Sequence, residues 1–131
     1  MRVIFKRILL VLLFFTATVS AQKKVWLDAG LKETTTVNGV YYSDDIQNKK
    51  MVTYFYKSGK IYKTIPYNEG KISGVYNEYY QTGSLKTTGK YENGLQEGVW
   101  KTYYSNGKIK EKGKYTKGEK VGVWKSFYKN I

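Results

Sequence analysis

The sequence has 131 residues, enough for one small domain, and its 23 basic and 10 acidic residues give a net charge of +13. It contains no cysteine and no histidine, which excludes disulfide bonds, thiolate or imidazole metal sites, and nucleophilic catalysis that depends on a histidine base. We therefore expect a strongly basic, non-enzymatic protein that uses no cofactor.

The first 21 residues have the layout of a secretory signal peptide. A basic start is followed by an almost wholly apolar run over residues 8–19, and small residues lead to Ala21. The apolar run has about a dozen residues, whereas a membrane-spanning helix needs about 20. We expect cleavage after Ala21 and export to the periplasm or the cell exterior; a retained anchor is the alternative. Cleavage removes Arg2, Lys6 and Arg7 and no acid, which lowers the net charge from +13 to +10.

Residues 22–51 do not follow the periodic pattern of the rest of the chain. The part from Trp26 to Tyr42 lacks the later motif, and residues 43–50 are polar enough to form an exposed loop. The sequence therefore predicts an N-terminal cap or irregular segment over 22–51.

From residue 52 to residue 131 the chain repeats with a period of 24 residues. Gly-Val-Tyr at 74–76 recurs as Gly-Val-Trp at 98–100 and again at 122–124, with no insertion. The first of these units, from residue 52, is degenerate because it lacks the Gly-Val-Trp start. Nine glycines keep the same interval and are expected to be structural turn glycines: Gly59, Gly83, Gly107, Gly70, Gly94, Gly118, Gly74, Gly98 and Gly122.

Each unit is predicted to be a β-hairpin. Residues 99–104 are aromatic and β-branched, which favours a strand, and Asn106-Gly107 then predicts a tight type I′ turn. The return strand alternates in polarity, and a looser second loop over 116–122 restarts the pattern. The predicted fold class is all-β: an elongated, twisted antiparallel meander of 24-residue hairpin repeats that stack to bury their aromatic residues.

The aromatic residues of the repeats are one candidate binding surface. A single-layer sheet covers one of its faces by its own fold, so the second aromatic row is available as a binding strip. The alternative is that the sheet curls and buries both rows. The candidate residues are Tyr76, Trp100, Tyr104, Trp124 and Tyr128.

A row of lysines on the return strand is the second candidate surface. Strand alternation places Lys108, Lys110, Lys112 and Lys114 on one face, where they would meet an anionic lipid headgroup, a sugar polymer or an acidic protein. The alternative is a solvated face that keeps the sheet soluble. Nucleic acid is disfavoured as a ligand because an exported protein seldom meets it.

The carboxylates do not form a convincing catalytic pair. Asp44 and Asp45 are adjacent in a loop, and Glu92 and Glu97 flank a turn between repeats. A glycosidase needs two facing carboxylates about 5–9 Å apart, whereas neighbours on a strand point to opposite faces.

The pattern Gly-Val-Trp-Lys-x-Tyr-Tyr-x-x-Gly-Lys-Ile-Lys, followed by Gly-Lys-Tyr and a later Gly, resembles the MORN-variant repeat over residues 52–131. Proteins of this kind often carry a YwqK-type antitoxin label, which describes the repeat architecture. A signal peptide does not fit a cytoplasmic antitoxin, which must meet its toxin where the toxin would act. The resemblance implies a scaffold or protein-interaction module, without catalytic residues, whose partner is an unknown protein or envelope component. The alternative is a carbohydrate-, cell-wall- or anionic-lipid-binding module, since exposed aromatic rings stack on sugars.

Overall fold

The computed structural model describes residues 23–44 and 50–129, and in this part of the chain every regular element is a strand. The predicted signal peptide lies outside the described residues. The strands run antiparallel in the order β1-β2-β3-β4-β6-β7-β8-β9-β10, and β5 pairs with β4. The strands are β1 (Lys24–Leu27), β2 (Tyr41–Asp44), β3 (Met51–Tyr56), β4 (Ile61–Asn68), β5 (Lys71–Ile72), β6 (Gly74–Tyr79), β7 (Leu85–Glu92), β8 (Leu95–Tyr103), β9 (Ile109–Thr116) and β10 (Glu119–Ser126).

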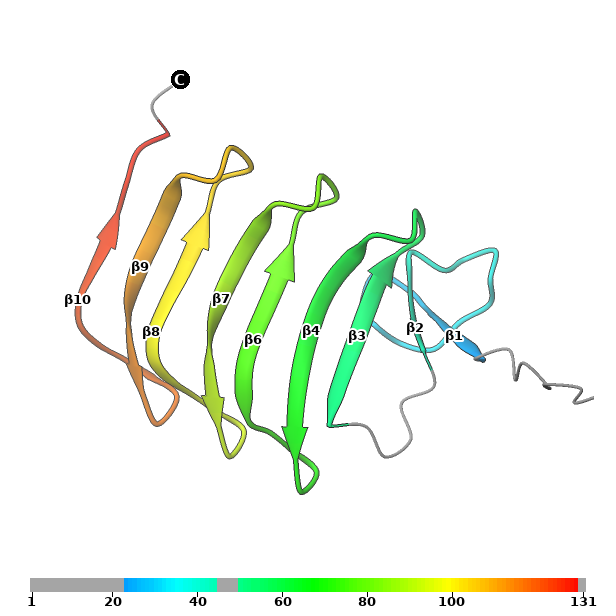
Figure 1. Ribbon diagram of the computed structural model, residues 1–131, viewed down its shortest axis with the longest axis horizontal. Coiled ribbons are helices and arrows are strands. Elements are labelled where there is room, and N and C mark those ends of the chain that lie inside the picture. The colour runs from blue at the N-terminus through cyan, green and yellow to red at the C-terminus, as the bar shows by residue number, and fades with distance from the viewer. Residues whose placement is uncertain (1–22, 45–49, 130–131) are drawn as a thin grey trace, which may run out of the picture.

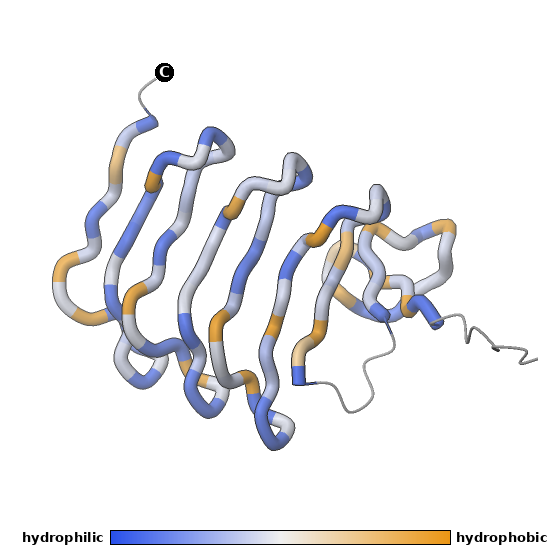
Figure 2. Tube along the Cα trace, viewed as in Figure 1, coloured by the Kyte–Doolittle hydropathy of each residue, from blue (hydrophilic) through white to orange (hydrophobic). Residues whose placement is uncertain are grey.

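The predicted all-β meander of hairpins is confirmed. From β3 to β10 the long strands lie side by side in chain order, and the turns of successive hairpins line up along both ends of the sheet (Figure 1). Hydrophobic residues recur as short patches at matching places in successive hairpins (Figure 2). Apart from the short β5, every strand thus pairs with the next strand along the chain, as expected for a repeat array whose units stabilise one another.

The sequence-based prediction of the turns is wrong: it makes the first turn of each repeat the tight one and the second turn the looser one, whereas the structure shows the reverse. In the first turn, the N–H of Gly107 donates to the carbonyl of Tyr104 (2.9 Å), and Gly107 has φ 83° while Asn106 does not have a positive φ. This is a type I turn followed by a left-handed glycine, not a type I′ turn. The second turn is the tighter one: Lys117 (φ 49°) and Gly118 (φ 85°) form the two-residue type I′ connection between Thr116 and Glu119.

The glycines that precede the Val-Trp and Val-Tyr pairs are not turn glycines. Gly98 (φ 73°) and Gly122 (φ 64°) lie inside β8 and β10, where the pairing with the preceding strand is irregular. A positive φ within a strand is accessible to glycine, and it marks a bulge. Gly74 (φ 124°) starts β6 in the same way.

The segment expected to be irregular before residue 52 contains two strands of the sheet. β2 pairs with β3 through Tyr42 opposite Phe55, and β1 pairs with β2 through Trp26 opposite Tyr42. The rings of Trp26 and Tyr42 are 5.3 Å apart, and those of Tyr42 and Phe55 are 5.0 Å apart. These strands cover the first repeat, and most of the buried apolar side chains lie at this end. The buried apolar side chains are Leu27, Tyr42, Val52, Tyr56, Ile65 and Trp100.

Candidate functional site

An unbroken chain of aromatic contacts crosses one face of the repeat array, which we call the aromatic face. Tyr91 lies between Tyr76 and Trp100 at ring distances of 5.9 and 5.2 Å, and Tyr115 lies between Trp100 and Trp124 at 5.8 and 5.1 Å. All four contacts are edge-to-face, the favourable geometry for aromatic quadrupoles. The aromatic side chains therefore pack mainly against one another, and together they form the apolar core of this part of the single-layer sheet.

Glycine makes this packing possible. Gly89 lies beneath the ring of Trp100 and Gly113 beneath the ring of Trp124, so closely that an added Cβ would lie 2.1 Å from the ring in each case. The indole N–H of Trp100 also donates to the carbonyl of Lys90 (3.3 Å), and Trp100 is only 6% exposed. Because the Trp100 ring is covered, it is not part of an exposed binding strip.

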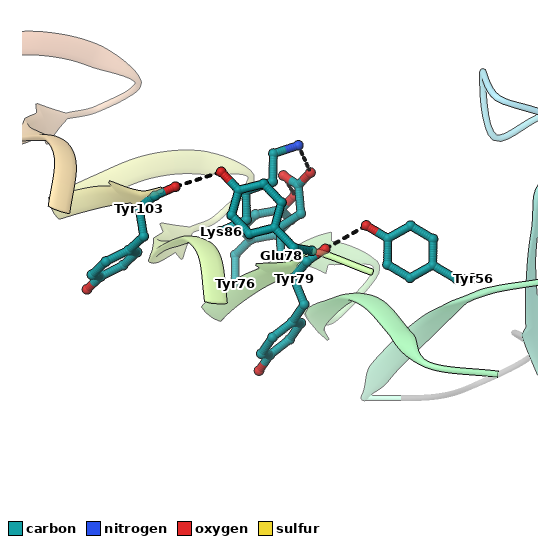
Figure 3. Close-up of polar contacts among 7 residues, drawn as sticks. Tyr56, Tyr76, Glu78, Tyr79, Lys86 and Tyr103 are labelled. Atoms are coloured by element: carbon teal, nitrogen blue, oxygen red, sulfur yellow. Dashed lines mark hydrogen bonds and ion pairs between the residues drawn. The ribbon is translucent and has the colours of Figure 1, made fainter. Parts of the chain in front are cut away.

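Tyrosine hydroxyls link each repeat to the next. Tyr56 donates to the carbonyl of Tyr79 (2.7 Å), as Figure 3 shows, and Tyr104 donates to the carbonyl of Phe127 (2.8 Å). Tyr80 makes the equivalent bond to the carbonyl of Tyr103 (2.7 Å). Tyr104, predicted as a binding residue, therefore acts as a structural link. Its counterpart Tyr128, the fourth residue of the series, is 95% exposed.

One ion pair lies on the aromatic side of β6. The Nζ of Lys86 is 2.8 Å from the carboxylate of Glu78, which also accepts a hydrogen bond from the hydroxyl of Tyr76 (3.3 Å). In Figure 3, the side chains of Tyr79 and Tyr103 point away from this pair. Burial, followed by the negative charge of Glu78, raises the pKa of Tyr76 well above its ordinary value of 10.0. The hydrogen bond to Glu78 raises the pKa of Lys86.

The opposite side of the last three strands carries unpaired positive charge. Lys112 on β9 lies directly opposite Lys101 on β8 and Lys125 on β10, and Lys114 lies opposite Val99. Val99 is 58% exposed, and none of these four lysines forms an ion pair with an acidic group in the described part of the chain. We call this surface the lysine–valine face; it consists of Val99, Lys101, Lys112, Lys114 and Lys125.

The predicted lysine row is therefore partly wrong, because two of its four residues do not lie on this face. Thr102 is opposite Glu111 while Tyr103 is opposite Ile109, so an extra residue, Lys110, interrupts the alternation of β9. The Nζ of Lys110 lies 5.9 Å from the ring centroid of Tyr104 rather than beside Lys112. Lys108 belongs to the turn before β9. Only Lys112 and Lys114 of the four remain in the row, and the sequence prediction missed Lys101 and Lys125, which only strand register brings opposite Lys112.

Among the described residues, the carboxylates considered from the sequence do not face one another as a catalytic pair; Asp44 lies at the end of β2, and Asp45 lies outside the described residues. Glu97 accepts a hydrogen bond from the backbone N–H of Lys117 (2.8 Å), and Glu92 lies 3.8 Å from the Nζ of Lys90. In residues 23–44 and 50–129, acidic side chains form no group of three or more able to hold a metal ion. The same residues include no helix of the length and apolar character needed to span a membrane.

Comparison with known families supports the repeat assignment. The family model described as the MORN repeat variant matches residues 51–69, 72–93 and 96–117. No curated protein matches the chain. Each matched stretch spans a hairpin or most of one, while β10 and the lysine it contributes to the lysine–valine face lie beyond the third stretch.

Proposed function

We propose that the protein is an exported, non-enzymatic interaction module of the bacterial cell envelope that binds a protein partner through its lysine–valine face. MORN repeats generally serve as protein- or membrane-interaction modules, and their presence at 51–117 supports a binding role. The signal-peptide layout of residues 1–21 is the support for export.

The observation that carries the proposal is the alignment of Lys101, Lys112 and Lys125 across three neighbouring strands. Directly opposed like charges destabilise a sheet, and side chains in such positions are about 5 Å apart. An acidic surface would compensate these charges, and the exposed Val99 adds apolar contact at the same place. The charges of the lysine–valine face thus destabilise the isolated protein and would be compensated in a complex with an acidic partner.

Two alternatives involve other ligands. The lysine–valine face also suits an anionic lipid surface, because lysines next to exposed apolar groups bind such surfaces. Sugar binding through the aromatic face is less well supported, since Trp100 is covered by its own repeat neighbours. The antitoxin label has no support in the geometry of the described residues.

The test is a crosslinking capture from envelope fractions, using protein recovered from cells that express the full chain. Parallel arms measure binding to isolated cell-wall polysaccharide and to vesicles containing anionic phospholipid. A saturable protein partner that is lost with Lys112→Glu supports the proposal. Binding to vesicles or polysaccharide alone, with no protein recovered, rejects it in favour of an envelope-surface module.

A further inference from the structure

The two edges of the sheet differ. At the β1 edge, the backbone N–H of Thr34 donates to the carbonyl of Trp26 (2.8 Å), and Leu27 forms a bridge with Glu33. The loop after β1 therefore covers that edge. β10 pairs with β9, and among the described residues no segment pairs with its other side. A free edge strand is a template for strand addition, and proteins usually cover it.

The backbone of β10 presents hydrogen-bonding groups outward at this edge. The N–H of Phe127 donates to the carbonyl of Lys110 on β9 (2.9 Å). Because successive residues of an antiparallel strand turn their N–H groups to opposite sides, the N–H of Ser126 points to the free edge. Ser126 is an exposed residue of this outermost strand.

A pocket lies at the end of the same edge. It has a volume of about 320 Å³ and is lined by Tyr104, Lys110, Glu111, Ser126, Phe127 and Tyr128. Phe127 is 40% exposed and Tyr128 is 95% exposed, so two aromatic side chains are available to contact a side chain in the pocket. Apolar contact next to an outward backbone donor suits an added strand.

The charge around the edge determines what kind of strand fits. Residues 109–129 hold seven lysines and two glutamates, an excess of five positive charges. A second copy laid against β10 would bring the positive charges of two equally basic edges together, which is repulsive. An acidic strand would instead be attracted by the same lysines.

We propose that the β10 edge binds an extended acidic segment of a partner protein by strand addition, with one of its apolar side chains in the pocket beside Tyr128. This site adjoins the lysine–valine face, because Lys125 belongs to β10 and to that face, but the proposed contact is made by the outward backbone of β10 and by the pocket. The edge experiment changes Ser126, whereas the capture experiment changes Lys112. Each proposal can therefore be rejected without rejecting the other.

The test uses a fluorescent peptide of alternating glutamate and valine and a matched peptide with lysine in place of glutamate, each titrated into the protein recovered from cells expressing the full chain. We expect saturable binding of the acidic peptide only. Ser126→Pro removes the outward N–H without removing a bond to β9 and should weaken binding about tenfold, whereas Ser126→Ala keeps the N–H and should bind as the unchanged protein does.

Amide hydrogen exchange of the unchanged protein provides a readout that does not rely on a variant folding. Bound acidic peptide should slow exchange at Ser126, because strand addition occupies that N–H. Equal binding of the lysine peptide, absence of acidic-peptide binding, or unchanged exchange at Ser126 would overturn the inference. Self-association through β10, seen by sedimentation and abolished by Ser126→Pro, would overturn it in favour of a second copy.

Discussion

The hydroxyl of Tyr104 donates a hydrogen bond to the carbonyl oxygen of Phe127, 23 residues further along the chain and in the next repeat. Tyr56 and Tyr80 make the same bond at the same separation. The phenol ring of each repeat thus fixes the position of the following hairpin. This link acts together with ring packing to hold a single-layer sheet in one curvature.

Replacing Tyr80 with phenylalanine should lower the free energy of unfolding by about 1 kcal/mol, because it leaves the part-buried carbonyl of Tyr103 without its donor. Urea unfolding followed by tryptophan fluorescence measures the change. Tyr128→Phe is the matched control: its hydroxyl is exposed, and the expected change is near zero. Equal effects of the two substitutions would refute a linking role for the hydroxyl.

Replacing Gly89 with alanine should destabilise the array by about 3 kcal/mol, because the new Cβ would lie 2.1 Å from the Trp100 ring. Trp100→Ala alone should cost about 3–5 kcal/mol. In the double variant the clash is gone, so the combined cost should fall short of the sum by about 1–3 kcal/mol. Simple additivity of the two changes in a denaturation series would mean that the ring does not lie over Gly89.

Stability should decrease above pH 10. Burial, together with nearby Glu78 and Tyr41, raises the pKa of Tyr62 from 10.0 to about 12. The folded protein holds this proton more tightly than the unfolded chain, so the stabilising contribution is complete below pH 10 and is lost as the pH rises towards 12. Thermal unfolding across this range, combined with the ultraviolet absorbance of phenolate, tests the prediction. A melting temperature independent of pH over the same range would contradict it.

Lys112→Glu should raise the free energy of unfolding by about 0.5–1 kcal/mol, since it replaces two repulsive cross-strand pairs with two attractive ones. Lys60→Glu, in the turn between β3 and β4, makes the same change of net charge away from this face and serves as the control. Urea midpoints in low salt compare the two variants. A loss of stability in Lys112→Glu would show that the three lysines do not oppose one another.

The repeating hairpins follow from the sequence because glycine and aromatic residues recur at a fixed interval. The turn types and bulges that shape the binding surfaces do not follow from the sequence. Residue preference predicts a type I′ turn at Asn106-Gly107, yet Asn106 has no positive φ there, and the two-residue type I′ turn lies between β9 and β10 at Lys117-Gly118. The bulge at Lys110 moves one lysine out of the expected row.

The lysine–valine face could not be predicted from the sequence either. Lys101 and Lys125 lie 24 residues apart, on strands at either side of Lys112, and only pairing register reveals that all three are aligned. The strands β1 and β2 were missed because they share no motif with the repeats. Their place in the sheet depends on contacts of Trp26 and Tyr42 made only after folding.

The most direct test of the proposed function is the capture of envelope proteins by the unchanged protein, Lys112→Glu and Lys60→Glu side by side. The account predicts one saturable partner, recovered with the unchanged protein and with Lys60→Glu and lost with Lys112→Glu, although the latter is the more stable protein. Equal recovery by all three proteins, or no protein partner at all, would contradict binding through the lysine–valine face.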